Sequence, residues 1–506
     1  MSKIASDVMS IIQDPTLTYQ QQVLALARLA ESKDESLPRD PDFVQALKDK
    51  CICDLGEGRS PYRPRYIVPD YQKFFREGSK FLGVEPPQDI WEATNALLIM
   101  YRNVPSITSF PVYLGNFSEL FEPFDKDEKE TRKALKLFLL NIDKTLTDSF
   151  VHANIGPKDN RVTRIILDLT KEMQLAVPNL SLIYNEDITP EDLAVASIDC
   201  MLKTSKPSFA NDKIYSSELG EGKYAIVSCY NAFRIGGGGY TLPRLRMYEI
   251  SKKATDIDDF FNRVLPFYVN LILRNIDQRI QFIVEKSNFF KTNYLVTEGF
   301  VHRDDFTGMV GLVGLAECTN QLLHITDKKK GFGNNKEAED LGVRILDAIY
   351  NMVQNHKGLY CHNCNDHYVM HAQVGIETDK GDDAPGVRIP IGCEPELFKH
   401  LSIEGRMHKH FESGVGDIFK FDQTWNNSPL ALLDIIKGAF HGGMRYFTAY
   451  DCDNDVVRVT GYLVKKSELE KLDQNTPSMN NCTVFGKGQR DFGHSLNRRV
   501  YKPDGK

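Results

Sequence analysis

Hydrophobic side chains recur with helical spacing in three segments of this chain: 125–146, 258–287 and 337–358. In the last segment, Leu341, Ile345 and Ile349 are each four residues apart, which places them on one face of a helix. The middle segment is apolar on most sides and contains Pro266, so we expect a buried helix that is broken or kinked there. These segments predict long helices that pack against a common core.

Shorter runs of strand-forming residues lie between and beyond these helices, over 180–185, 224–229, 309–315, 368–376 and 456–464. Helices and short strands alternate from about residue 90 to about residue 440. This alternation favours an α/β architecture, and at this length a barrel is favoured over an open sheet.

The pattern divides the chain into three parts. Residues 1–60 begin with helical spacing that is interrupted at Asp14-Pro15, and they form an N-terminal helical extension. Residues 61–440 hold the alternating α/β core. Residues 441–506 form a C-terminal domain, because glycines, aromatic residues and acids become frequent together after residue 440.

Composition excludes several classes of function. The net charge of −7 over 506 residues gives no electrostatic basis for binding a nucleic acid polymer. No apolar stretch approaches the roughly 20 residues needed to span a bilayer. The N-terminus lacks the pattern of a signal peptide, so we expect a cytoplasmic protein. Ten cysteines in a chain of this length do not indicate a disulfide framework.

Two motifs invite a functional interpretation without establishing one. The four glycines at 236–239 predict a flexible connector. Cys361, Cys364, His367 and His371 form C-x-x-C followed by H-x-x-x-H within 361–371. Structural zinc sites usually separate their two ligand pairs by a folded loop, so thiols and polar groups that line a cleft are favoured over a zinc site.

Gly461 lies inside the strand-forming run at 456–464. A glycine in a strand loses packing and backbone entropy, and this cost needs a compensating reason. One explanation is a tight turn or bulge. Another is that the α-carbon itself reacts, because a glycyl radical can flatten without a side-chain clash while the flanking amide groups delocalise its electron. Such a radical would need a cysteine nearby to relay it.

The segment "RVTGYL" at 458–463, close to the C-terminus, resembles the radical-bearing signature of the glycyl radical enzymes. Its ending is most similar to that of the anaerobic (class III) ribonucleotide reductases. Among subgroups, the chain is most similar to the YjjI-type glycine radical enzymes. The resemblance implies that Gly461 carries the radical and that the fold is the family's ten-stranded α/β barrel with a C-terminal glycyl radical loop.

Two cysteines compete for the thiyl role that the resemblance implies. Cys229 ends a strand, and a glycine-rich segment with "LPRL" follows it, as in the cysteine hairpin of the anaerobic reductases. Cys318 is the alternative thiyl, at the start of an expected helix. There Glu317 occupies the position that resembles the family's, so we expect Cys229 to be the thiyl and Glu317 to act as an acid–base group.

The resemblance also implies the partners. A radical S-adenosylmethionine activase would install the glycyl radical, the substrate would be a small molecule, and the chain would form a homodimer. We expect no other bound cofactor, with zinc the lesser alternative at 361–371. Candidate substrate contacts are His302, Asp304, Asp305 and His371.

Three departures from the family leave the reaction open. The reductases have two C-x-x-C pairs before the glycine loop, whereas only Cys452 stands there in this chain. Tyr230 replaces the second cysteine of the pyruvate formate-lyases, and Asn231 replaces the glutamate of the dehydratases. Nucleotide reduction, with formate or the Cys361/Cys364 pair as reductant, remains the alternative.

Overall fold

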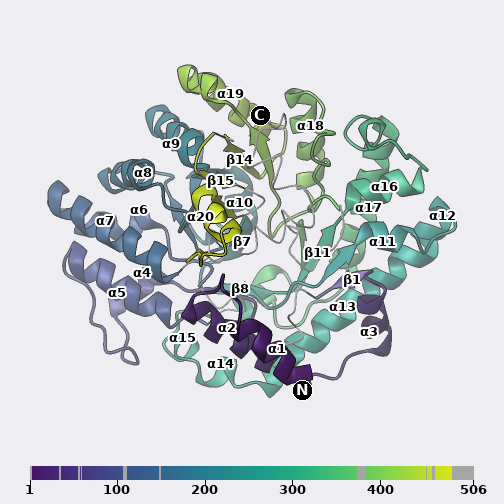
Figure 1. Ribbon diagram of the computed structural model, residues 1–506, viewed down its shortest axis with the longest axis horizontal. Coiled ribbons are helices and arrows are strands. Elements are labelled where there is room, and N and C mark those ends of the chain that lie inside the picture. Colours follow the sequence, from purple (N-terminus) through teal and green to yellow (C-terminus); the bar gives the residue numbers. More distant parts are fainter. Residues whose placement is uncertain are drawn as a thin grey trace.

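The computed structural model describes residues 3–33, 36–54, 57, 60–105, 111–146, 150–372, 383–451, 453–458 and 462–480. Gly461 and Cys452 therefore lie outside the described residues. The described strands form two larger sheets, one smaller sheet and two hairpins. Figure 1 shows them at the centre of the molecule, with helices around them.

The larger sheet has the strand order β13-β14-β5-β4-β3. Its strands are β3 (His152–Ile155), β4 (Asn179–Tyr184), β5 (Ser208–Asn211), β13 (Asp417–Lys420) and β14 (Tyr446–Tyr450). Strands β3, β4 and β5 are parallel, as are β13 and β14, whereas β14 runs antiparallel to β5. Every residue of β4 is buried, as expected for a strand covered on both faces.

The remaining strands complete the centre of the molecule. The four-stranded sheet has the order β1-β9-β11-β12, with β1 (Ile52–Cys53), β9 (Arg244–Arg246), β11 (Met309–Val313) and β12 (Val369–Ala372). The small sheet joins β2 (Tyr66–Val68), β8 (Gly237–Gly239) and β10 (Phe306–Thr307). The hairpins are β6 (Tyr224–Val227) with β7 (Asn231–Arg234), and β15 (Val456–Arg458) with β16 (Leu463–Lys465).

Amphipathic helices cover these strands. In Figure 1 they lie on the left as α4 (Tyr71–Glu77), α5 (Ile90–Arg102), α6 (Phe117–Phe121), α7 (Glu128–Thr145), α8 (Arg161–Met173) and α9 (Glu191–Thr204). On the right and at the top lie α11 (Met247–Ser251), α12 (Ile257–Asp259), α13 (Leu265–Gln281), α16 (Leu315–Leu322), α17 (Lys336–Asn355), α18 (Leu397–His408) and α19 (Pro429–His441). Shorter helices are α10 (Asp212–Leu219), α14 (Phe289–Thr292) and α15 (Tyr294–Thr297). Helix α8 buries Val162, Ile166 and Leu169 on one face, which is the pattern of a helix on a sheet.

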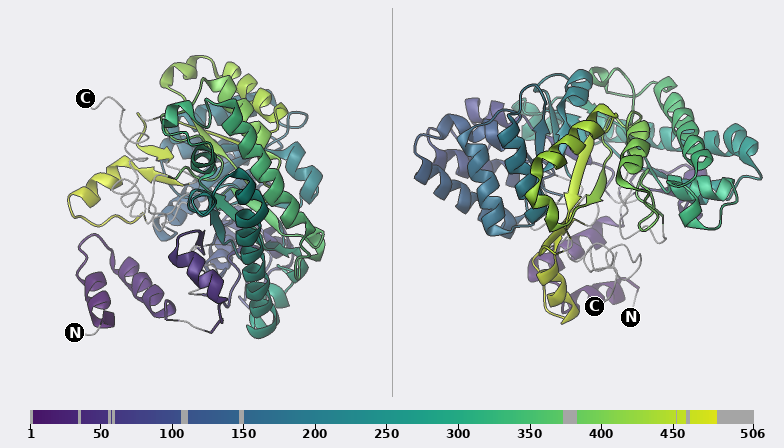
Figure 2. Two further views of the ribbon diagram at one scale, coloured as in Figure 1. Left: turned by 90° about the vertical axis from the view of Figure 1, so that its right-hand side faces the viewer. Right: turned by 90° about the horizontal axis from the view of Figure 1, so that it is seen from above.

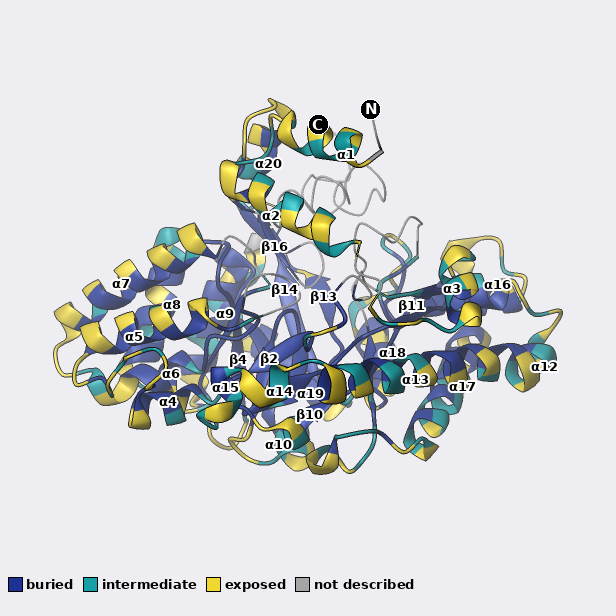
Figure 3. Ribbon diagram, turned by 90° about the horizontal axis from the view of Figure 1, so that it is seen from below, coloured by how far each residue is buried: buried dark blue, intermediate teal, exposed yellow. Residues whose placement is uncertain are grey.

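The first and the last described segments of the chain lie together outside this ring of helices (Figures 2 and 3). Helices α1 (Lys3–Ile12) and α2 (Tyr19–Glu31) lie on the same side as α20 (Lys466–Asp473), away from the strands (Figures 2 and 3). A third N-terminal helix, α3 (Pro41–Lys48), packs against α13. The side-chain amide of Gln21 donates a hydrogen bond to the carbonyl oxygen of Ser478 at 2.9 Å, and this contact is buried. The first helices are thus attached to the segment that follows α20.

The helix predictions are confirmed within a few residues at each end. The segment 125–146 is α7, and 337–358 is α17. Over 258–287 the helix is continuous but irregular: a π-helical turn at Phe260–Val264 precedes α13, and Pro266 lies in its first turn. Pro266 has no amide hydrogen to donate to the preceding turn, and the π-helical turn directly before it is where the helix adjusts to that loss.

Two sequence interpretations are wrong. The glycines at 236–239 are not a flexible connector, because β8 pairs with β2 on one side and β10 on the other. A Cβ atom at Gly238 would stand 2.0 Å from the carbonyl oxygen of Tyr66, so only glycine fits. The run 456–464 is not one strand either: β15 and β16 pair antiparallel, with Arg458 opposite Leu463.

Candidate functional site

Cys229 lies at the tip of the hairpin formed by β6 and β7. Val227 pairs with Asn231, which leaves Ser228, Cys229 and Tyr230 in the turn. Ser228 has a φ of 56°, a left-handed conformation that lets the chain reverse within three residues. The Cys229 side chain is 5% exposed. The predicted cysteine hairpin is therefore present, with its thiol buried inside the protein.

A chain of hydrogen bonds holds this tip from neighbouring strands. The Tyr446 hydroxyl donates to the carbonyl oxygen of Cys229 at 3.2 Å and lies 3.0 Å from Oγ of Ser181. Ser181 Oγ lies 2.9 Å from Nε2 of His152, and Nδ1 of His152 lies 2.6 Å from the carbonyl oxygen of Ser228. Nδ1 must carry the proton to donate to that carbonyl. Burial lowers the pKa of His152 to about 3, so the chain consists of neutral groups.

Aromatic rings surround the thiol. Burial raises the pKa of Tyr66, Tyr230 and Tyr446, and the charge of a Cys229 thiolate would add to each shift. The rings of Tyr230 and Tyr446 are 5.8 Å apart. Such a wall excludes water from the thiol, which suits chemistry that water would quench.

Tyr230 has a polar group on each side. Its ring stacks on the His371 ring at 5.7 Å, and the guanidinium of Arg388 lies 5.7 Å from its centre. Both side chains are buried, and neither His371 Nδ1 nor Arg388 Nη1 has a hydrogen-bond partner among the described residues. Burial lowers the pKa of His371 to about 3, so that ring is neutral. A buried polar atom without a partner is costly, and a ligand's polar group would offset that cost.

Arg458, at the end of β15, connects the glycine segment to this site. Its Nη2 donates to Asn179 Oδ1 at 2.8 Å and to the carbonyl oxygen of Ser205 at 3.0 Å. Burial lowers the pKa of Arg458, and the side chains of Tyr446 and Cys229 oppose that shift. Arg458 is thus tied to Asn179, which pairs with His152 across β4 and β3, and His152 contacts the Ser228 carbonyl oxygen in the Cys229 turn. Residues 459–461, which include Gly461, lie outside the described residues.

Cys318, the alternative thiyl, lies in a different environment. It is fully buried on α16, and that burial raises the pKa of its thiol. Helix α16 packs against α11 and α17. Cys318 therefore has the setting of a core residue.

Glu317 is buried next to Cys318. One carboxylate oxygen accepts a hydrogen bond from the backbone of Ala384 at 3.1 Å, and the other has no partner among the described residues. Burial, and to a lesser extent Asp383, raises the pKa of Glu317 to about 7. Such a pKa suits an acid–base group, as predicted for this residue, although no contact with Cys229 is described.

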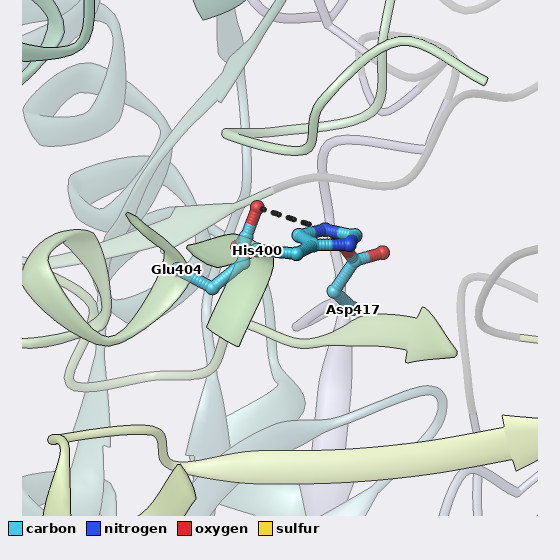
Figure 4. A group of neighbouring side chains, drawn as sticks. All are labelled: His400, Glu404 and Asp417. Atoms are coloured by element: carbon cyan, nitrogen blue, oxygen red, sulfur yellow. Dashed lines mark hydrogen bonds and ion pairs between the residues drawn. The ribbon is translucent and has the colours of Figure 1, made fainter. Parts of the chain in front are cut away.

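Cys361, Cys364, His367 and His371 do not come together as a ligand set. Cys361 packs against Gly358 in the core, while His371 faces Tyr230. Burial raises the pKa of both cysteines to about 12. Within the described ranges, the group whose ligand atoms lie within 4.8 Å of one another is instead His400, Glu404 and Asp417 (Figure 4).

A cavity of about 340 Å³ lies at the open end of the cysteine hairpin. Cys364 and His367 line it, as does Asp305, which forms an ion pair with Arg234 at 3.0 Å. His302 is exposed, and Asp304 pairs with the adjacent Arg303. Of the predicted substrate contacts, Asp305 thus lines this second space, His302 and Asp304 are not part of its lining, and His371 stacks on Tyr230.

The sequence did not identify His152, Ser181, Tyr446 or Arg388 as site residues. The available signal was weak: His152 and Ser181 are polar residues in short strands that also contain Asn154 and Asn179. Arg388 lies in an irregular segment with no motif.

Comparison with known proteins identifies the family. The model of the "Glycyl radical enzyme YjjI-like" family matches residues 17–501. The chain belongs to this family. It is therefore a glycyl radical enzyme.

Relatives cover nearly the whole chain. An uncharacterized protein of Haemophilus influenzae is 41% identical over 501 residues, which are 98% of this chain and 97% of that protein. The uncharacterized protein YjjI of Escherichia coli is 39% identical, over 94% of this chain and 92% of its own. The printed names of these relatives give no substrate.

Solved structures share the fold. An anaerobic ribonucleotide reductase aligns over 99% of this chain and 86% of its own with a TM-score of 0.69 and 13% identity. Hydroxyproline dehydratase from Clostridioides difficile aligns over 96% of this chain and 88% of its own, with a TM-score of 0.69 and 11% identity. The mixed α/β fold is therefore that of glycyl radical enzymes. No helix among the described residues is both long and apolar enough to cross a membrane.

Proposed function

We propose that Gly461 stores the radical and that Cys229 relays it to a substrate. A separate radical S-adenosylmethionine activase removes one α-hydrogen atom from Gly461. The thiol of Cys229 then gives its hydrogen atom to Gly461 and becomes a thiyl radical. The thiyl takes a hydrogen atom from a substrate carbon and later returns one to the product radical, which makes Cys229 a thiyl again. Cys229 then takes a hydrogen atom back from Gly461, and this restores both the thiol and the stored glycyl radical.

The observation that supports this proposal is that Arg458 is tied through Asn179 and His152 to the turn that holds Cys229. Gly461 is the third residue after Arg458, and a hydrogen atom can pass only between groups in close contact. The proposal includes the family's ten-stranded barrel. The two larger sheets would form its wall, and the two hairpins would meet inside it. The division at residues 60 and 440, a homodimer and a cytoplasmic location belong to the same proposal.

The substrate that fits this site is a small polar molecule. Arg388 and His371 flank Tyr230, directly after the thiol residue, and each has a buried nitrogen atom without a partner among the described residues. A substrate hydroxyl or carboxylate could satisfy both. Nucleotide reduction stays the alternative from the sequence, and stabilisation of the protein by added CTP would favour it.

A solvent-exchange experiment tests the relay without knowledge of the substrate. After anaerobic activation, the glycyl radical should give a doublet in electron paramagnetic resonance, split by its remaining α-hydrogen. In D₂O the thiol carries deuterium, so repeated transfer between Gly461 and Cys229 should replace that hydrogen and collapse the doublet.

Variants give the decisive outcomes. Gly461→Ala should show no glycyl signal, and air should cleave the activated wild-type chain at residue 461. Cys229→Ser should keep the doublet in D₂O, because a serine O–H bond is too strong to relay the radical. A doublet that collapses in Cys229→Ser would contradict the role of Cys229.

A further inference from the structure

Three ligand-type side chains converge between helix α18 and strand β13. His400 and Glu404 are four residues apart on α18 and so lie on one face of it. Asp417 is the first residue of β13. The three side chains point toward one another in Figure 4, and their exposed fractions are 6%, 0% and 2%. No step of the proposed radical relay uses them.

The distances suit a single bound ion. Nε2 of His400 lies 2.6 Å from Oδ2 of Asp417 and 4.0 Å from Oε1 of Glu404. One ligand atom from each residue lies within 4.8 Å of the others. Nitrogen and oxygen ligands bind a transition metal at about 2.0–2.2 Å, which puts neighbouring ligand atoms roughly 3 to 3.5 Å apart. Small side-chain adjustments would bring all three to that spacing.

His408 orients the glutamate. Its Nδ1 accepts a hydrogen bond from the backbone of Arg445 at 3.1 Å, so its Nε2 carries the proton and donates to Oε2 of Glu404 at 3.2 Å. The other oxygen, Oε1, is fully buried and has no hydrogen-bond partner among the described residues. A carboxylate that binds a metal ion is usually held in place by a hydrogen bond of this kind. Here His408 holds one oxygen of Glu404, and the other oxygen faces His400.

The surrounding charges leave one carboxylate without a counter-charge. Arg388 Nε lies 3.4 Å from Asp417 Oδ1, and it compensates that residue. The charge of Arg445 is taken by Glu218, through two contacts of 2.6 Å. Burial, together with the nearby Asp417, raises the pKa of Glu404 well above its ordinary value. Burial thus disfavours the charged form of Glu404, and a bound cation beside it would favour that form.

We propose that His400, Glu404 and Asp417 bind one divalent first-row transition metal ion, with His408 as the residue that orients Glu404. An imidazole with two carboxylates favours Zn²⁺, Fe²⁺ or Mn²⁺ over Mg²⁺ and Ca²⁺, which prefer all-oxygen sites. Binding breaks the His400–Asp417 hydrogen bond: the proton on Nε2 of His400 moves to Nδ1 so that Nε2 can bind the ion, and any proton on Glu404 leaves to water. The ion would join α18 to β13. Because Asp417 also contacts Arg388, the ion would help to hold Arg388 in place beside Tyr230.

Metal binding to the full chain, without activation, tests this site. Protein purified anaerobically and stripped with a chelator is dialysed separately against Zn²⁺, Fe²⁺ or Mn²⁺, and bound metal per chain is measured by mass spectrometry. Because the ligand atoms must give up their protons to bind the ion, affinity should rise with pH. The wild type should also show a higher Tm with the bound ion than without it.

Glu404→Gln is the informative variant, since glutamine copies the protonated glutamate and should fold as the metal-free wild type does. It should bind one ion fewer per chain than the wild type and lose the rise in Tm. A Cys361→Ser/Cys364→Ser background removes adventitious thiol binding. His441→Gln is the control, because His441 pairs with Glu186 on the surface and its loss should change nothing. Equal metal content in the wild type and Glu404→Gln, or no rise in Tm with any of the three ions, would overturn the proposal.

Discussion

The hydroxyl group of Tyr446 donates a hydrogen bond to the carbonyl oxygen of Cys229, although the two residues are 217 positions apart. This contact joins strand β14 of the larger sheet to the tip of the cysteine hairpin. The position of the thiol therefore depends on a strand from the last part of the chain, and substitutions there should change radical transfer without touching the cysteine.

Tyr446→Phe should slow the collapse of the glycyl doublet in D₂O by about tenfold, because the Cys229 turn loses its support. The lost hydrogen bond should also cost about 1 kcal/mol of unfolding free energy. Tyr71→Phe is the matched control: its hydroxyl donates to the Tyr113 carbonyl at 2.8 Å, also buried. Both variants should lose similar stability, but only Tyr446→Phe should exchange slowly. Equal exchange rates in the two variants would remove Tyr446 from the site.

Cys318→Ala should leave solvent exchange at the radical within about twofold of the wild type. Cys318 is fully buried in α16, which packs against α11 and α17. Loss of its sulfur from the core should lower stability by about 1 kcal/mol. If exchange stops in Cys318→Ala and continues in Cys229→Ser, the assignment of the thiyl must be reversed.

Glu317→Gln should gain stability relative to the wild type as the pH rises from 5 to 8. The pKa of Glu317 is raised from 4.5 to about 7 in the folded state, so the folded chain binds this proton more tightly than the unfolded chain. The contribution of the Glu317 proton to the free energy of unfolding is complete below pH 4.5. It is lost as the pH rises toward 7, by at most about 1.4 kcal/mol per pH unit.

Denaturant unfolding of both proteins at pH 5 and pH 8 measures this difference. Glu337→Gln, at an exposed position of α17, should show no pH-dependent gain. A Glu317→Gln difference that is the same at both pH values would mean that Glu317 is ionised throughout.

Gln21→Glu should speed installation of the glycyl radical several-fold. The change keeps the side-chain oxygen that caps α2 at Thr18 but replaces the amide that donates to the Ser478 carbonyl. The C-terminal segment would then detach more readily for the activase. Gln22→Glu, one residue further along α2, is the control. The measurement is the yield of glycyl radical against time, followed by electron paramagnetic resonance. Equal rates of radical formation in both variants would show that this contact does not limit activation.

Gly238→Ala should destabilise the protein by about 3 kcal/mol or more, because its Cβ would overlap the Tyr66 carbonyl oxygen. Gly438→Ala in α19 meets no atom within 4 Å and should be neutral or stabilise by up to about 1 kcal/mol. Thermal unfolding of the two variants compares them. Similar Tm values would show that β8 can move away from β2.

Local sequence was enough to predict the cysteine hairpin, because a short strand, a cysteine and a proline-bearing return are neighbours in the chain. It was not enough to predict the support of that hairpin, since His152, Ser181 and Tyr446 meet only through the pairing of distant strands. The glycine run was misread for a similar reason: glycines have no side-chain pattern, and what makes them necessary is the close approach of β2 and β10.

The run at 456–464 shows a different limit. Alternating apolar residues are equally typical of one long strand and of two short strands joined by a turn, and only the pairing of β15 with β16 separates these cases. The metal-type cluster at His400 was missed because its third member, Asp417, comes from another element and has no spacing relation to the other two.

The long separation between Cys229 and Tyr446 also orders events during synthesis. A ribosome that has just extruded the cysteine hairpin has not yet made β14, so the turn emerges without its partner. The reactive thiol can take its final place only after the chain is nearly complete. A chain truncated before β14 should thus hold the Cys229 turn without its hydrogen bond to Tyr446. An incomplete enzyme would therefore not place the thiol for radical transfer.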